Sequence, residues 1–182
     1  SLTNGIIKYF HIHPVIVGHE CSGDIVQVGK KWQDQFKPGE KFALQPALNY
    51  QGKLDSPGYS YRYCGGAATY CIMPHEVMEL GCLLKYDGDS YFKASLGEPM
   101  SCIICGYHAN YHTNKHNYDH AMGTKVGGSI LIMGGCGPMG LGAVSYGLAF
   151  ENKPKRIVVT DVKKEKIERA KQCITVEEAA EK

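Results

Sequence analysis

The sequence predicts an α/β protein with a β-rich part, because two different patterns follow one another along the chain. Over roughly the first ninety residues, glycine or proline recurs about every eight to twelve positions, which is typical of a β-barrel or sandwich. Short apolar stretches lie between these breakers, at residues 14–17, 24–28 and 69–73. From residue 129 onwards, apolar strand patterns alternate with helical ones, as in a parallel sheet.

The second half of the chain can be divided into individual elements. Few breakers interrupt residues 94–109, so this stretch reads as a helix or a helix with an interrupted start. A polar stretch rich in histidine, asparagine and glycine follows and reads as a connection. The connection is predicted at 108–128, strands at 129–133 and 156–160, and helices at 138–150 and about 163–173.

Composition and charge exclude several classes of protein. The 182 residues are 43% hydrophobic and 21% charged, as in an ordinary folded domain. The formal net charge of +2 comes from interspersed signs, so nucleic acid is not an expected partner. No apolar stretch of about 18 residues could span a membrane, and the first residues lack a signal-peptide pattern. We therefore expect a cytoplasmic protein with no membrane partner.

Eight scattered cysteines are interpreted as reduced, buried thiols. Cys102 and Cys105 form a C-x-x-C pair, but no second pair stands at zinc-ribbon spacing. Packing in the core is therefore favoured over a metal or redox role for these two residues.

Residues 135–140 read G-C-G-P-M-G, a G-x-G-x-x-G turn between a predicted strand and a predicted helix. Asp161 follows 21 residues after Gly140, at the end of the next strand. In a dinucleotide site the glycines allow a tight turn, close approach of the pyrophosphate and helix packing, and the acidic residue binds the ribose hydroxyls and repels a 2′-phosphate. NAD(H) is therefore favoured over NADP(H), although the turn could serve packing alone and Asp161 could simply end a strand. The predicted cofactor-binding residues are Gly135, Gly137, Pro138, Met139, Gly140 and Asp161.

A resemblance to a known family covers nearly the whole chain. Residues 18–29, G-H-E-C-S-G-D-I-V-Q-V-G, resemble the catalytic-zinc signature of the zinc-dependent medium-chain alcohol dehydrogenases. Residues 36–42, 64–70 and 97–102 are similar to further family segments, in the family's order, and the E-P-x-S at 98–101 is similar to the sorbitol and threonine dehydrogenase branch. Within that branch, the chain looks most like the sorbose-1-phosphate reductase group.

The resemblance implies a fold and an activity. It implies a GroES-like β-barrel catalytic domain over residues 1–122 and the first βαβ part of a Rossmann NAD-binding domain over residues 123–182. The expected activity is hydride transfer between NAD(H) and a polyol, a ketose or a sugar phosphate, in a homo-oligomer. The alternative is a truncated, catalytically incompetent NAD-binding scaffold or interaction protein.

The same resemblance implies one catalytic Zn²⁺, with His19 and Glu98 as ligands and Glu20 in a supporting catalytic role. Zinc accepts nitrogen, sulfur and carboxylate ligands, which these residue types provide. We expect His19 and Glu20 to point to opposite faces, because neighbouring residues of a strand do so. We expect no structural zinc site, because residues 44–63 contain no cysteine.

The sequence departs from the family pattern in two places. The family's first zinc ligand is a cysteine upstream of the G-H-E, and residues 1–17 contain none. The dinucleotide unit also lacks the later strands that complete such a site, so we expect a piece of a longer enzyme. His108, His112, His116 and His120 recur every four residues; a solvated connection is favoured for them over a metal stripe or a substrate contact.

Overall fold

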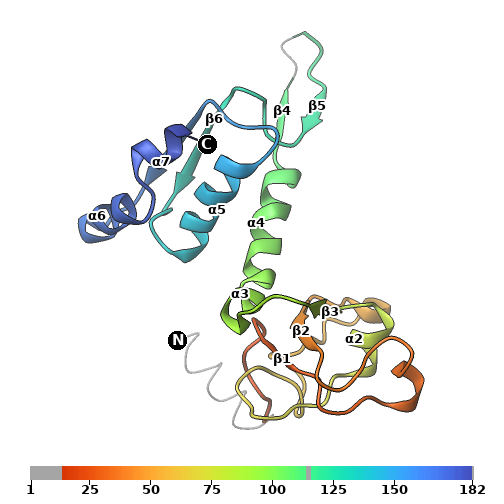
Figure 1. Ribbon diagram of the computed structural model, residues 1–182. Coiled ribbons are helices and arrows are strands. Elements are labelled where there is room, and N and C mark those ends of the chain that lie inside the picture. Colours follow the sequence, from red (N-terminus) through yellow and green to blue (C-terminus); the bar gives the residue numbers. More distant parts are fainter. Residues whose placement is uncertain (1–13, 114–115, 182) are drawn as a thin grey trace. The chain divides into compact units, whose positions relative to one another are not determined.

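The computed structural model describes residues 14–113 and 116–181, which fall into two compact units, Ser1–Glu98 and Pro99–Lys182 (Figure 1). The domain boundary expected between residues 122 and 123 refers to the catalytic and cofactor domains that the resemblance implies. It is a different division from these two units and remains a prediction. Within the described ranges, no helix is both long enough and apolar enough to cross a bilayer.

The first unit is built on an antiparallel sheet with the strand order β1-β2-β3. In its register Ser22 pairs with Ala43, and Leu44 pairs with Leu83. Short helices occupy the connections. The strands are β1 (Ser22–Asp24), β2 (Lys41–Leu44) and β3 (Leu83–Tyr86), and the helices are η1 (Lys30–Trp32), η2 (Tyr50–Gly52), α2 (His75–Glu79) and α3 (Tyr91–Ser95).

The core of the first unit lies between this sheet and α2. Phe42 and Leu44 are buried while their neighbours on β2 are half-buried, because alternate side chains of a strand point to opposite faces. Val77 of α2 has no exposed surface and packs in the same cluster, together with Leu48 and Leu83. The alternation on β2 thus fixes which face of the sheet is covered.

The barrel or sandwich expected for this unit is not seen among its described residues, which form three short strands. Residues 14–17 and 69–73, expected as strands, are irregular, and residues 25–28 lie beyond the end of β1. These segments keep isolated hydrogen bonds, such as Ile16 N to Tyr61 O at 3.2 Å and Ile72 N to Tyr63 O at 2.9 Å. Gly18, with a φ of +94°, interrupts the extended backbone that a longer ladder would need.

The second unit contains the predicted βαβ arrangement. Strands β6 (Ser129–Met133) and β7 (Arg156–Thr160) pair in parallel, and α5 (Pro138–Ala149) connects them. The two strands match the predicted ranges, and α5 and α6 (Lys164–Cys173) match theirs to within a residue, whereas no helix was predicted over Val176–Glu181. The interrupted helical start is also confirmed, since α3 ends at Ser95 and α4 begins at Gly97. The remaining helices are α4 (Gly97–Ala109), α6 (Lys164–Cys173) and α7 (Val176–Glu181).

The prediction for residues 108–128 was wrong in part. The stretch 108–128 is not only a connection, because it contains an antiparallel hairpin of β4 (Tyr111–Thr113) and β5 (His120–Met122). Five of its six strand residues are exposed, so no apolar alternation signals these strands.

The cysteines are all free thiols as expected, but only Cys64 and Cys136 are buried. Three others are half-buried, and Cys102, Cys105 and Cys173 are exposed. The helix α4 buries Pro99, Ile103 and Tyr107, which recur every four residues. Cys102 and Cys105 therefore fall outside the buried stripe of that helix.

Candidate functional site

His19 and Glu20 lie in a bend that immediately precedes β1. Gly18 turns the chain there with its positive φ, and its carbonyl accepts a hydrogen bond from Gly66 N at 2.7 Å. The backbone of Gly58 also approaches closely, since a Cβ added at Gly58 would lie 2.6 Å from His19 N. Glycines from two separate loops thus fix the backbone that presents His19.

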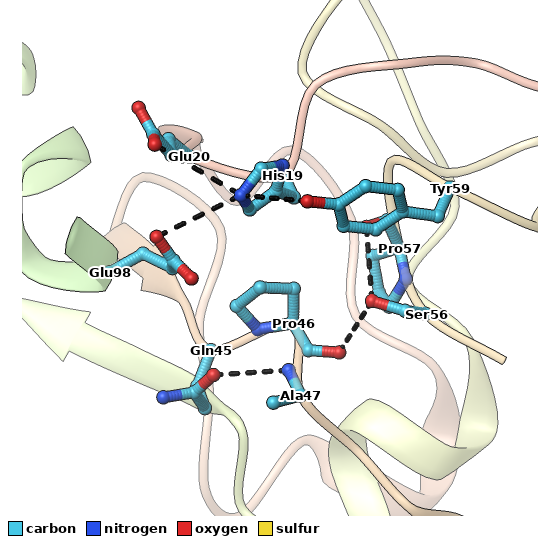
Figure 2. Close-up of polar contacts among 9 residues, drawn as sticks. All are labelled: His19, Glu20, Gln45, Pro46, Ala47, Ser56, Pro57, Tyr59 and Glu98. Atoms are coloured by element: carbon cyan, nitrogen blue, oxygen red, sulfur yellow. Dashed lines mark hydrogen bonds and ion pairs between the residues drawn. The ribbon is translucent and has the colours of Figure 1, made fainter. Parts of the chain in front are cut away.

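Two carboxylates face the imidazole of His19 (Figure 2). His19 Nε2 lies 3.9 Å from Glu98 Oε2 and 4.0 Å from Glu20 Oε1. The Glu98 side chain is 12% exposed and that of Glu20 is 52% exposed, so Glu98 forms the protected side of the cluster. Glu98 belongs to the first turn of α4, where the helix amino terminus favours a negative charge.

The three side chains can together hold a metal ion. One ligand atom from each of His19, Glu20 and Glu98 lies within 4.8 Å of the other two. Among the described residues, no other group of three or more His, Cys, Asp or Glu side chains brings its ligand atoms this close together. One imidazole nitrogen and two carboxylates form a donor set that suits Zn²⁺.

The expectation that His19 and Glu20 point to opposite faces was wrong. That expectation assumed a strand, whereas both residues lie in a bend, where side chains do not alternate strictly. Glu20 therefore reaches the same ring nitrogen that Glu98 faces.

Tyr59 is part of the cluster and was missed by sequence reasoning. Its hydroxyl lies 3.0 Å from His19 Nε2, and the two ring centroids are 4.6 Å apart with planes inclined by 30° (Figure 2). Nothing in the sequence relates Tyr59 to a residue 40 positions earlier. The adjacent Gly58, with a φ of +78°, marks the turn that brings the tyrosine to the imidazole.

The three glycines of the turn after β6 differ in the space that a side chain would find: there is none at Gly135 and Gly140, and there is room at Gly137. A Cβ at Gly140 would lie 2.5 Å from the carbonyl carbon of Gly135, and one at Gly135 would lie 2.8 Å from Val159 Cγ1. A Cβ at Gly137 would meet nothing within 4 Å. Gly140 is thus required for packing of α5 on the turn, and Gly135 for packing of the turn on β6 and β7, whereas the space beside Gly137 is open.

The beginning of α5 has the features of an anion site. Gly137 is the N-cap, with extended φ and ψ of −94° and 178°, and Pro138 occupies the first turn. Pro138 and Met139 are both exposed. The unpaired N–H groups of a helix amino terminus, together with its positive dipole end, favour a phosphate there.

Asp161 follows β7 directly and lies beside the glycine turn. Its Oδ1 accepts a hydrogen bond from Lys163 N at 3.1 Å, and its Oδ2 accepts one from Cys136 N at 3.3 Å. The hydrogen bond from the Lys163 backbone, followed by that from Cys136, lowers the pKa of the Asp161 carboxyl. Asp161 is therefore charged at neutral pH and held close to the turn.

The histidines that recur every four residues from His108 to His120 do not lie along one helix in the described residues. His108 lies in α4, whereas His112 and His120 lie in the hairpin of β4 and β5. His108 lines a hollow of about 580 Å³ in the second unit, and its Nε2 is 3.4 Å from Tyr146 Oη. The hollow lies at the carboxyl end of α5, whereas the glycine turn lies at the amino end of the same helix, so the two are separate.

Known proteins resemble the chain in sequence. A family model described as the alcohol dehydrogenase GroES-like domain matches residues 2–81. Mannitol-1-phosphate 5-dehydrogenase from Aliivibrio fischeri is 50% identical over 166 residues, covering 91% of this chain and 39% of that protein. L-sorbose 1-phosphate reductase from Klebsiella pneumoniae is 46% identical over 158 residues, covering 87% of this chain and 38% of that protein. The chain thus spans about two-fifths of the length of these curated relatives.

The fold is also found among solved structures. The crystal structure of a short chain alcohol dehydrogenase from Escherichia coli CFT073, complexed with the cofactor NADH, matches with a TM-score of 0.61. The match covers 86% of this chain and 44% of that protein, at 22% sequence identity. At that identity the likeness supports the fold alone.

Proposed function

We propose that the chain is part of an oxidoreductase of the medium-chain alcohol dehydrogenase type, which transfers a hydride between NAD(H) and a polyol, a ketose or a sugar phosphate. The match of residues 2–81 to the alcohol dehydrogenase GroES-like domain and the similarity to the two relatives named above support this proposal. The observation that carries this proposal is the meeting of His19, Glu20 and Glu98 around one point. The names of two relatives refer to a sugar alcohol and a sugar that each carry a phosphate on carbon 1, which supports a phosphorylated substrate.

In this proposal His19 and Glu98 hold one zinc ion, and Glu20 supports it as the catalytic residue. Zinc, when bound, supplies a Lewis acid that polarises a substrate hydroxyl or carbonyl. Glu98, mostly shielded from water, balances the positive charge on the protected side. Glu20, half exposed, places a second negative charge at the open side, where a substrate hydroxyl can donate a hydrogen bond to it.

Residues of the second unit bind the dinucleotide in this proposal. The open space at Gly137 and the N–H groups at the beginning of α5 accept the pyrophosphate. The charged Asp161 accepts hydrogen bonds from the ribose hydroxyls and disfavours a 2′-phosphate, so NAD(H) is preferred to NADP(H). Gly135, Pro138, Met139 and Gly140 form the turn that holds these groups in place.

The test is NAD-linked turnover of the intact protein on a panel of sugar phosphates, polyols, threonine and simple alcohols. We expect turnover on a sugar phosphate or polyol, its loss in His19→Ala and its retention in His75→Ala. His75 is a matched control, since its Nε2 also lies near a carboxylate, at 3.4 Å from Glu79 Oε1. Unchanged turnover in His19→Ala would contradict the metal role. A protein that is inert on every substrate and stays metal-free would favour the NAD-binding scaffold.

A further inference from the structure

Cys64 and Cys71 face each other across a short irregular hairpin in the first unit. The hairpin is marked by the hydrogen bond from Ile72 N to Tyr63 O at 2.9 Å, which makes residues 64 and 71 the next opposing pair. The Cys64 thiol has two sulfur acceptors within reach, Met73 Sδ at 3.8 Å and the sulfur of Cys71. Cys64 is fully buried, whereas Cys71 is half-buried and thus reachable from solvent.

The pair is chemically asymmetric. The hydrogen bond from the Cys64 thiol, followed by one from the Gly65 backbone, outweighs burial and lowers the pKa of Cys71 to about 6. The same Cys64–Cys71 hydrogen bond, together with burial, holds the pKa of Cys64 well above its ordinary value. Cys71 is therefore the sulfur of the pair that ionises more readily, and Cys64 is the one that holds its proton more tightly. Thiolate character combined with access is what makes a cysteine susceptible to oxidation.

The hairpin also packs on the segment that presents His19. Ala67 N donates to Val17 O at 2.9 Å, and Gly66 N donates to Gly18 O at 2.7 Å. A Cβ on Gly66 would lie 2.8 Å from Cys21 Cβ, so no free space separates the two segments. A movement of the two sides of the hairpin is therefore passed directly to residues 17–21.

We propose that Cys64 and Cys71 are a peroxide-sensitive thiol pair, and that their oxidation to a disulfide weakens metal binding at His19. The second part of this proposal rests on the proposed function, and the first part does not. A disulfide would fix the separation and orientation of the two sides of the hairpin, because disulfide geometry is specific. Gly66 is hydrogen-bonded to Gly18, so a change in the hairpin also alters the backbone that presents His19 to Glu98.

Hydrogen peroxide is the oxidant in this reaction. The Cys71 thiolate attacks one peroxide oxygen, the O–O bond breaks, and the hydroxide that leaves takes up a proton to become water. The sulfur of Cys64, on losing its proton, then attacks the sulfenic acid sulfur of Cys71, the S–O bond breaks, and a second water leaves. The two thiols lose two electrons and two protons in total, and one peroxide is reduced to two waters.

The test follows the disulfide and zinc affinity separately, in the intact protein treated with hydrogen peroxide and then with dithiothreitol. Mass spectrometry of a non-reduced digest should find a peptide linked between positions 64 and 71. Competition with a chromogenic chelator should show zinc affinity falling by about tenfold on oxidation and recovering on reduction. Cys71→Ser should abolish both changes, and Cys102→Ser, at an exposed cysteine of α4, should keep them.

Absence of the 64–71 linkage after peroxide treatment would overturn the thiol pair, as would irreversible oxidation of Cys71 alone. A linkage that leaves zinc affinity unchanged would overturn the connection to the metal centre. A reduced protein that binds no zinc would contradict the proposed function, while the digest would still decide whether the thiol pair exists.

Discussion

Alanine substitutions at two glycines of the same turn should have opposite consequences. In Gly140→Ala the new Cβ would stand 2.5 Å from the carbonyl carbon of Gly135. The obstacle is backbone rather than a flexible side chain, so α5 must move away from the turn. Overpacking of this kind costs about 1–3 kcal/mol, and we expect the free energy of unfolding of Gly140→Ala to fall by that amount.

Gly137→Ala should instead leave stability unchanged and weaken NADH binding. Its Cβ would meet nothing within 4 Å, and a φ of −94° is open to alanine, so the stability change should stay within about 0.5 kcal/mol. In the proposed cofactor site, the same methyl group would stand where the pyrophosphate approaches the backbone. If its steric cost is again about 1–3 kcal/mol, the Kd for NADH rises by about 5- to 150-fold.

Urea unfolding measures the first quantity, and a fluorescence titration with NADH measures the second. Equal NADH affinity in Gly137→Ala and the wild type would refute the approach of the pyrophosphate to Gly137. Equal stability in Gly140→Ala and the wild type would show that the close contact with Gly135 does not exist in solution.

Three further predictions concern other parts of the chain. Asp161→Asn should raise the affinity for NADPH relative to NADH, measured by parallel titrations, because it removes the charge beside the ribose; an unchanged ratio would contradict this role. Val77→Ala should lower the free energy of unfolding in urea by about 2 kcal/mol, since Val77 is fully buried in the core; a change below about 0.5 kcal/mol would exclude it from that core. The hydrogen bond from Lys85 lowers the pKa of Glu40, so its contribution to stability is present above the unfolded pKa of about 4.3 and is lost as pH falls. Lys85→Ala should therefore flatten the acid limb of the stability profile, and an unaltered limb would argue against the ion pair.

The second unit could be predicted well because its signals are local. The glycine turn, the apolar strands and the amphipathic α6 each occupy a few consecutive residues, and periodicity is sufficient to identify them. The first unit could not be predicted as well, because its strands are short and their partners are distant in sequence. β1 pairs with β2 and β2 with β3 across long connections, and no local pattern shows where glycines such as Gly18 end the ladder.

The candidate metal site was predictable in its residues but not in its geometry. His19 and Glu98 stand in recognisable segments, and the structure brings them within 3.9 Å. The orientation of Glu20 depends on a bend that strand periodicity does not reveal. Tyr59 joins the site through a turn at Gly58, a long-range contact without a local signal.

Zinc binding by the intact protein, compared with Glu98→Gln, tests most directly whether this cluster is a metal centre. Glu79→Gln is the control, since Glu79 also faces a histidine, at 3.4 Å, but lies outside the cluster. We predict about one zinc per chain in the wild type and in the control, and a fall in zinc affinity of at least about tenfold in Glu98→Gln. Equal zinc affinity in all three proteins would contradict the assignment of His19, Glu20 and Glu98 as the metal centre.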